Sequence, residues 1–253
     1  MKTTEKAFSG LMALCLIFFV MGLAIRPPLA AAGMPGLEVK EMPDMSDYYP
    51  SHPVIATGDV IKVAILAPFS GFAALNGEIY WCITNWVAHD INKRGGIVVD
   101  GKRKKVRFIK ADTQQQPSVA KQIAEKMCLQ EKVDFMWGTP GSNISLILQG
   151  VAKKYRKIYM NCASMSNGLM DGKHFNRYTF QTDWTVSQVG DTLAYYYSKQ
   201  PENKFYILDQ DYMFGHDLAE AFKAGLKKYK PDAQIVGEAY HPLFAYDYAP
   251  YLT

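Results

Sequence analysis

The segment from Val60 to Ser164 alternates short aliphatic runs with longer stretches whose apolar residues recur at helical spacing. The first run, "VIKVAILAP", is continuously apolar and β-branched apart from one lysine, and Pro68 ends it. Such a run is typical of a strand buried on both faces of a parallel sheet. Because parallel strands need crossover connections of one hand, the alternation predicts an α/β fold with an open, doubly wound parallel sheet.

Each element has its own sequence signal. A helix after the first strand is predicted from apolar residues at helical spacing and the stop at Gly95-Gly96; the residues are Ile79, Ile83, Trp86, Val87 and Ile91. Asp100-Gly101 predicts a hairpin that leads into a strand ending near Asp112. Further helices are expected in "PSVAKQIAEKMCLQEK" and "NISLILQGVAKKYRK", and further strands in "VDFMWG" and "IYMNCAS".

The pattern restarts after "RYTFQTDW". A helix is expected over residues 185–199, followed by a strand in "KFYILDQD", a helix in "GHDLAEAFKAGLKKYK" and a strand in "AQIVGEAY". These elements are too few to complete a second sheet before Thr253, although "HPLFAYDYAPYLT" suggests the opening of one more helix. The sequence therefore predicts a first α/β unit over residues 59–180 and an incomplete second unit over 181–253.

The first 32 residues have the layout of a secretory signal peptide. Lys2 and Lys6 precede an apolar run over residues 8–25, and an Ala-x-Ala site ends at Ala32. An uncleaved membrane anchor is the alternative, since the run is close to the shortest span of a bilayer. Residues 33–58, rich in Pro, Gly and acidic side chains, are expected to form an extended leader. The mature protein is predicted to be soluble outside the cytoplasm.

Charge and cysteine content narrow the function classes. The formal net charge of +4 is dispersed along the chain, which is weak evidence for nucleic acid, and no nucleic-acid partner is predicted. Beyond Cys15 the chain has Cys82, Cys128 and Cys162, an odd number, so at least one thiol is expected to be free. Their spacing does not suit zinc, and a disulfide between two of them stays open.

Ligands of doubly wound sheets bind beyond the carboxyl ends of the strands. The loops at that edge are "APFSGFAALNG", "GTPGSN", "NCASMSNG" and "DQDYMFGHD". None has a nucleophile elbow, a Walker A loop, a dinucleotide fingerprint or metal-ligand spacing, so no enzyme, cofactor or metal is predicted. Ser142 and Asn143 are good N-cap residues. They either cap the helix alone or also present its N-terminus to an anionic or polar ligand.

Several segments, taken in their order and spacing, resemble the substrate-binding proteins of ABC transporters. The segments are "IKVAILAPFSGFAALNGE", "VDGKRKKVRFIKADTQQQPSVAKQIAEKM", "FMWGTPGSN", "IYMNCASMSNGL", "RYTFQTDW" and "DYMFGHDLAEAFKAGL". The likeness is to the leucine/isoleucine/valine-binding branch of the type I periplasmic-binding fold. It implies a two-lobed clamp that closes on a small solute and delivers it to a membrane permease without chemistry.

The resemblance also implies a set of ligand-binding residues. Ser142 matches the serine after the third strand, and Asn76 matches a side chain that covers the ligand from the first loop. The segment Ala163–Met165, with Ser164 at its centre, matches the small-residue loop after the fourth strand, and Phe214 matches an aromatic of the second lobe. Met165 replaces a hydroxyl residue and Phe214 a tyrosine, which favours a more apolar ligand such as a carboxylic acid, an amide or an aromatic compound.

Members of this family usually continue well beyond the length seen in this sequence. The resemblance therefore implies a C-terminally truncated member, which we expect to bind ligand poorly and to aggregate. A sensor or receptor domain of the same fold, with the same pocket but a signalling partner, is the alternative function.

Overall fold

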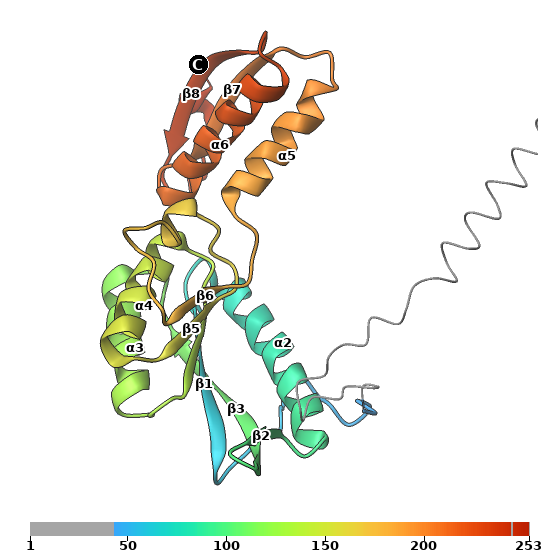
Figure 1. Cartoon of the computed structure of the whole chain (residues 1–253), viewed down its shortest axis with the longest axis vertical. Coiled ribbons are helices and arrows are strands. Elements are labelled where there is room, and N and C mark those ends of the chain that lie inside the picture. The colour runs from blue at the N-terminus through green and yellow to red at the C-terminus, as the bar shows by residue number, and fades with distance from the viewer. Residues whose placement is uncertain (1–42, 244, 253) are drawn as a thin grey trace, which may run out of the picture. The chain divides into compact units, whose positions relative to one another are not determined.

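A computed structural model describes residues 43–243 and 245–252. The predicted signal peptide, residues 1–32, and the first part of the predicted leader lie outside the described residues. The cartoon in Figure 1 labels the helices and strands named below.

The larger sheet has six strands in the order β2-β3-β1-β4-β5-β6. All neighbours are parallel except the β2–β3 hairpin. The strands are β1 Val60–Ala67, β2 Ile97–Val99, β3 Lys102–Asp112, β4 Phe135–Gly138, β5 Ile158–Asn161 and β6 Thr179–Gln181. The strand order reverses at β1, so the predicted doubly wound parallel sheet is confirmed. Asp100 and Gly101 have φ of 50° and 75°, as a two-residue hairpin with a primed turn requires.

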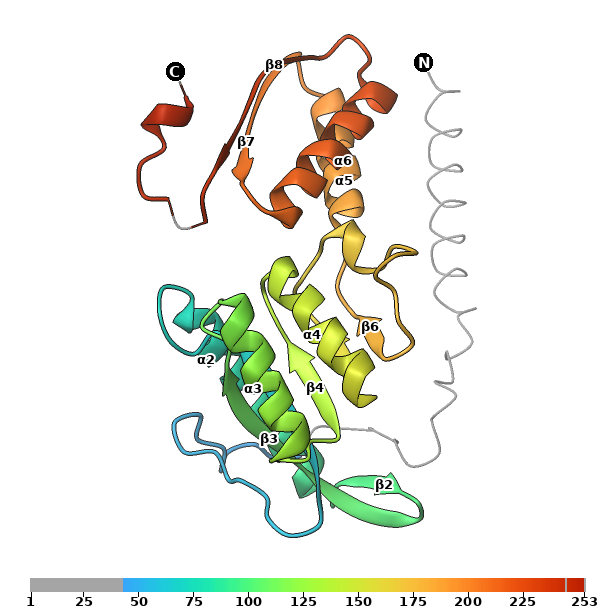
Figure 2. The same cartoon turned by 90° about the vertical axis from the view of Figure 1, so that its left-hand side faces the viewer.

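Three helices connect these strands. They are α2 Ala74–Lys93, α3 Pro117–Leu129 and α4 Ser142–Tyr155. In Figures 1 and 2, α3 and α4 lie together on one face of the sheet, whereas α2 lies on the other. Pro117 is in the first turn of α3, where its missing N–H costs nothing.

The buried core lies under α3 and α4. Ala64, Leu66, Met136 and Tyr159 point to this side from the strands and meet residues such as Ile144 of α4. Each of these five residues is inaccessible to solvent. Close packing extends to the strand ends, because a Cβ on Gly138 would stand 2.0 Å from the carbonyl oxygen of Leu66.

The apolar residues that predict helix α2 are less buried than such a pattern indicates. The helix forms where its apolar spacing predicts, but Ile79, Ile83, Trp86 and Val87 are exposed, at 44%, 53%, 39% and 39%. The residues that α2 buries are Gly77, Thr84, Asn85 and Ala88. The helical spacing correctly predicts an apolar side of α2. Within the described residues, however, most of that side is not packed against another element.

A second sheet follows β6, which continues the first sheet up to Gln181. It contains the parallel strands β7 Lys204–Gln210 and β8 Gln234–His241, and the chain also forms α5 Val186–Ser198 and α6 Met213–Tyr229. The helices α5 and α6 pack closely, since a Cβ on Gly225 would lie 2.5 Å from the Cβ of Ala194. The helix expected in the last residues is a single 3-10 turn, η2 Ala249–Tyr251. A similar turn, η1 Asn167–Leu169, follows β5.

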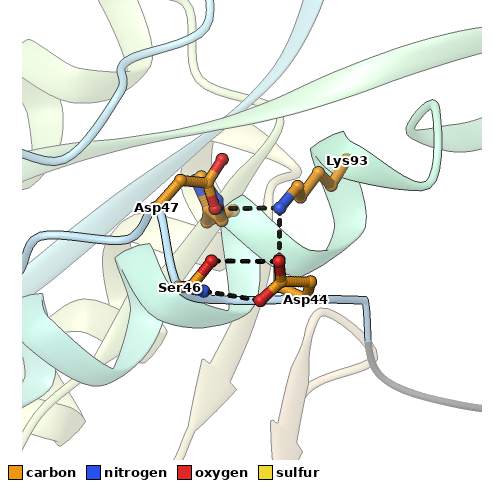
Figure 3. A network of polar contacts seen from close by, with 5 residues as sticks. Asp44, Ser46, Asp47 and Lys93 are labelled. Atoms are coloured by element: carbon orange, nitrogen blue, oxygen red, sulfur yellow. Dashed lines mark hydrogen bonds and ion pairs between the residues drawn. The ribbon is translucent and has the colours of Figure 1, made fainter.

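Residues 43–58 contain no helix or strand, and hydrogen bonds hold them against α2. We call this segment the strap. Lys93 donates to a carboxylate oxygen of Asp47 at 2.8 Å and to the carbonyl of Asp44, and Ser46 donates to the Asp44 carboxylate (Figure 3). Tyr48 donates its hydroxyl to the carbonyl of Cys82 at 3.0 Å. The strap therefore lies along one side of α2.

The three described cysteines, Cys82, Cys128 and Cys162, are all free. The disulfide that the sequence left open is therefore not formed. Cys128 is buried in the core under α3, where its thiol lies 3.8 Å from the sulfur of Met136.

Candidate functional site

The connection from β4 to α4 carries the serine and asparagine expected to cap the helix. The cap is instead Gly141, in extended conformation, and no side chain caps α4. Ser142 and Asn143 are the first two helical residues, so the prediction that either is an N-cap is wrong. The first helical hydrogen bond runs from Ser145 N to the Gly141 carbonyl. The N–H groups before it have no acceptor within the helix, and the helix dipole makes them attractive to an anion.

The connection after β5 folds back onto this helix end. Ser164 donates its hydroxyl to the carbonyl of Thr139 at 2.6 Å and its N–H to Asn161 Oδ1 at 3.0 Å. Ser166 N lies 3.4 Å from Ser142 Oγ, which accepts its hydrogen. The structure therefore brings Ser142 and the 163–166 segment together. It also shows that the Ser164 hydroxyl proton is already used inside the protein.

Unused hydrogen-bonding atoms gather around the same loops. Thr139 Oγ1 and Ser166 Oγ have no partner among the described residues, although both residues are 0% exposed. Other buried atoms without a partner there are Gln115 Oε1, Asn143 Oδ1 and both amide atoms of Gln181. These residues all follow or end strands of the first sheet at its carboxyl edge. Because an unsatisfied buried polar atom costs about 1–3 kcal/mol, they are poised to accept or donate to a polar guest.

The loop between β1 and α2 is ordered by a carboxylate. Asp112 accepts hydrogen bonds from Phe69 N at 2.8 Å, Ser70 Oγ at 2.6 Å and Gln114 N at 2.9 Å. Burial alone would raise the pKa of Asp112, but these hydrogen bonds outweigh it and hold the pKa below its usual value. Asn76, expected to cover the ligand, is exposed in the first turn of α2.

Two aromatic residues line the α2 side of the same edge. Tyr80 of α2 meets Trp137 of β4 edge to face, with ring centroids 5.2 Å apart. Burial, and the proximity of Cys162 and Asp183, raise the pKa of Tyr80 to about 12. Burial raises the pKa of the Cys162 thiol to about 12, so the thiol stays protonated well above physiological pH.

The remaining predicted site residues lie around these loops or in the second sheet region. Ala163 and Met165 flank Ser164 and are partly exposed. Phe214, at the start of α6, stacks on Tyr212 with ring centroids 5.9 Å apart. Within the described residues, no hydrogen bond or ring contact joins Phe214 to Ser142 or Ala163. The helix α6 approaches the first unit at Asp217, whose carboxylate accepts from Gly168 N at 3.4 Å.

Sequence reasoning missed Thr139, Gln115 and Gln181 as candidate site residues. Thr139 lies inside the "GTPGSN" loop, one of the loops expected at the ligand-binding edge of the sheet, so the sequence could have indicated it. Gln115 and Gln181 had no comparable signal, because an isolated glutamine next to a strand is common in any soluble protein.

Two features are absent from the described part of the chain: a metal-ligand cluster and a membrane-spanning helix. Residues 43–243 and 245–252 contain no group of three or more His, Cys, Asp or Glu side chains placed to hold a metal ion. Over the same residues, no helix has the length and apolar character needed to cross a bilayer.

A family model described as "Periplasmic binding protein" matches residues 60–253. The chain belongs to the periplasmic binding protein family. Among curated proteins it is similar to "Leu/Ile/Val-binding protein homolog 6" of Brucella suis, with 25% identity over 198 residues. The match covers 77% of this chain and 47% of that protein, so the chain spans about half the length of the curated relatives it matches.

Solved structures of the family share the fold. An ABC-transporter solute-binding protein from Rhodopseudomonas palustris, in complex with 3,4-dihydroxybenzoic acid, is 26% identical with a TM-score of 0.63. The match covers 77% of this chain and 51% of that one. The substrate-binding protein LivJ of Streptococcus pneumoniae, in complex with isoleucine, is 22% identical with a TM-score of 0.65, over 76% of this chain and 53% of LivJ. These structures agree with the type I periplasmic-binding fold that the sequence resembles.

Proposed function

We propose that this periplasmic binding protein is the extracytoplasmic solute-binding component of an ABC-type uptake system. Its solute is an amino acid or a related small carboxylate, amide or aromatic acid, and it passes that solute to a membrane permease without altering it. The proposal rests on the buried hydroxyls of Thr139 and Ser166, which have no partner among the described residues and adjoin the uncapped N-terminus of α4. Names of family relatives support it, since they describe binding proteins for branched-chain amino acids and benzoates.

The chemistry of the loops favours a carboxylate or amide headgroup. Free N–H groups at a helix N-terminus stabilise negative charge, and the two hydroxyls add hydrogen bonds. Met165 and Phe214 present no hydroxyl to the ligand, and Tyr80 and Trp137 line the nearby edge with aromatic surface. We therefore place acids with apolar or aromatic bodies ahead of small polar amino acids.

Binding is measured on the chain itself by ligand-observed NMR, which detects weak affinities. The panel is isoleucine, benzoate, 3,4-dihydroxybenzoate and benzamide, with benzyl alcohol as a neutral control without a carboxylate or amide. We expect dissociation constants on the order of 0.1–10 mM for the acids and no binding of benzyl alcohol.

The variant Thr139→Val tests the site. It removes one hydroxyl at nearly constant volume, so stability is kept while acid binding weakens by about tenfold, the value of one hydrogen bond to a charged group. Thr192→Val is the matched control, because Thr192 is exposed on α5 and donates to the Gln188 carbonyl. Equal binding by both variants would refute the site.

A further inference from the structure

The hairpin formed by β2 and β3 carries an unbroken run of basic residues, "KRKK", at positions 102–105. β3 begins at Lys102, whereas β1 begins at Val60, which lies opposite Lys105. The hairpin therefore extends beyond the start of β1, and Figures 1 and 2 show it at that end of the sheet. We call residues 97–105 the basic hairpin.

Most of these basic side chains have no carboxylate partner among the described residues. Lys102 and Lys105 are exposed and form no hydrogen bond or ion pair there. Arg103 donates to the backbone carbonyls of Arg94 at 3.4 Å and Gly96 at 3.1 Å. These bonds hold the hairpin against the end of α2, but they leave the charge of the guanidinium group unpaired.

Acidic residues at the same end of the sheet offset only part of this charge. Asp59 pairs with Lys104 at 2.8 Å, so that lysine is neutralised. Asp100 lies in the turn of the hairpin, and Glu131 and Asp134 come shortly before β4. The Asp134 carboxylate is engaged by the backbone, since it accepts from the N–H of Lys62 at 2.8 Å.

The last turns of the helices add basic residues at this end. Because β1, β3, β4 and β5 run parallel, each connecting helix returns from the carboxyl edge of the sheet to its amino edge. Lys126 of α3 and Lys153 of α4 therefore lie near the starts of the strands. These two lysines offset the dipoles of their own helices, whereas Lys102 and Lys105 have no such local role.

The upstream part of the chain joins the first sheet close to this hairpin. Lys93, in the last turn of α2, donates to the Asp44 carbonyl at the start of the strap, and Arg103 donates to the carbonyl of the next residue, Arg94. The apolar run over residues 8–25 is expected to enter a bilayer, either as a signal peptide or as an anchor. Residues 26–42 span at most about 60 Å when extended. A bilayer that holds the apolar run is therefore within reach of the basic hairpin.

We propose that the basic hairpin docks on the surface of an anionic phospholipid bilayer. Lysine and arginine side chains near such a surface are attracted by its negative potential, and each further charge adds to the attraction. Val98 is 40% exposed and lies opposite Arg103 in the β2–β3 pair, so an apolar side chain accompanies the charges into the headgroup region. Periplasmic binding proteins lie outside the cytoplasm, so a bilayer rather than nucleic acid is the extended polyanion that they meet.

Docking at this edge leaves the candidate ligand loops free. Those loops lie at the carboxyl edge of the same sheet, and β1, which joins the two edges, has eight residues. Eight residues of strand are about 25 Å long, which exceeds the Debye length of about 8 Å at physiological salt. Binding to a bilayer and binding of a solute are therefore separate properties of the chain.

The test measures how the full chain partitions onto sedimented vesicles. One set contains phosphatidylglycerol and phosphatidylcholine, and the other contains phosphatidylcholine alone. The ratio of the two partition coefficients isolates charge, because the apolar N-terminal run acts on both compositions alike. We expect a ratio on the order of a hundred at low salt, which 0.5 M salt removes. Equal partitioning onto both sets at low salt would overturn the proposal.

Variants with two reversed charges locate the docking surface. Lys102→Glu combined with Lys105→Glu changes side chains that make no contact within the described residues, and we expect the ratio to fall about thirtyfold. The neutral pair, Lys102→Gln with Lys105→Gln, should lower it about fivefold. Lys204→Glu with Lys227→Glu is the matched control, since both lysines are exposed, in β7 and α6. If the control pair lowers the ratio as much as the hairpin pair, net charge alone acts and the basic hairpin is not the docking surface.

Two further measurements identify the partner and separate docking from solute binding. Amide exchange in residues 97–105 should slow on the phosphatidylglycerol vesicles, and protection confined to other segments would contradict the proposal. Tighter binding of an oligoglutamate peptide than of the vesicles, per mole of negative charge, would also contradict it. Benzoate binding should be the same in the wild type and in Lys102→Glu with Lys105→Glu. If no form of the chain binds benzoate but the vesicle preference holds, the solute-binding function fails and the docking surface stands.

Discussion

The two faces of the six-stranded sheet use the same kind of residues with different results. On the face under α3 and α4, Leu66, Met136 and Ile144 are sealed from solvent. On the face under α2, similar side chains such as Phe135 and Ile158 line an open groove. The difference shows that apolar strand and helix patterns specify a buried surface but not the element that covers it.

The largest expected contrast comes from one substitution made on both faces. Ile144→Ala deletes methylene and methyl groups from a fully buried site of α4, and we expect a loss of about 2–5 kcal/mol in the free energy of unfolding. Ile83→Ala, at a residue of α2 that is 53% exposed, is expected to change it by less than about 1 kcal/mol. Urea denaturation measures both. Equal losses would mean that the α2 face is covered in solution.

Hydroxyl deletions give the next contrast. Tyr159 donates to the Gly138 carbonyl at 2.9 Å and lies 2.9 Å from Ser145 Oγ in the closed core. Tyr159→Phe removes the partner of the Ser145 hydroxyl, although the Gly138 carbonyl keeps a hydrogen bond from Cys162 N at 3.3 Å, and it should cost about 1–3 kcal/mol. Tyr80→Phe is the control on the other face, since the Tyr80 hydroxyl has no partner in the described structure, and its stability should match that of the wild type. A comparable loss in Tyr80→Phe would show a hidden partner under α2.

Much of the fold was predictable from sequence because its signals are local. Pro68, Pro117, Gly95-Gly96 and the Asp100-Gly101 turn place element ends within a few residues, and the alternation of elements determines the sheet class. Exposure of the α2 stripe was not predictable, because it depends on contacts between distant segments. The ligand-binding role of the predicted residues remains a prediction.

The candidate site was predictable only in part, for the same reason. The loops after β4 and β5 followed from the rule that ligands meet the carboxyl edge of the sheet. Two features depend on how these loops meet in space: the Ser164 hydroxyl donates to the Thr139 carbonyl, and the Thr139 hydroxyl has no partner among the described residues. No residue spacing encodes that meeting.

A pH series tests whether the α2 side of the sheet excludes water near the site. Burial raises the pKa of Cys162 to about 12, above the value of about 8.5 expected in the unfolded chain. The protonated thiol therefore contributes its full stability below about pH 8.5 and loses it as the pH rises toward 12. Between pH 8 and pH 10 we expect a decline of about 1–2 kcal/mol that is absent in Cys162→Ala, measured by urea denaturation. The same decline in both proteins would show that the thiol is solvated.

The smallest effect is expected on the side of α2 that the strap occupies. Hydrogen bonds from Lys93 and then from His89 lower the pKa of Asp47 to about 2. The contribution of this carboxylate is therefore fully present above about pH 3.8 and is lost as the pH falls from there through about 2. Asp47→Asn removes the ion pair with Lys93, so amide exchange in the strap, at Tyr48 and His52, should rise about two- to fivefold, as for an exposed pair. Global stability should not change, because the strap contributes no residue to the buried core.

Asp59→Asn, which removes the separate pair with Lys104, is the control and should leave amide exchange in the strap unchanged. If amide exchange is unchanged in Asp47→Asn, the hydrogen bond from Tyr48 to the Cys82 carbonyl is sufficient to hold the strap on α2. The strap side of α2 would then differ from its exposed apolar side by that one hydrogen bond, not by a network of polar contacts.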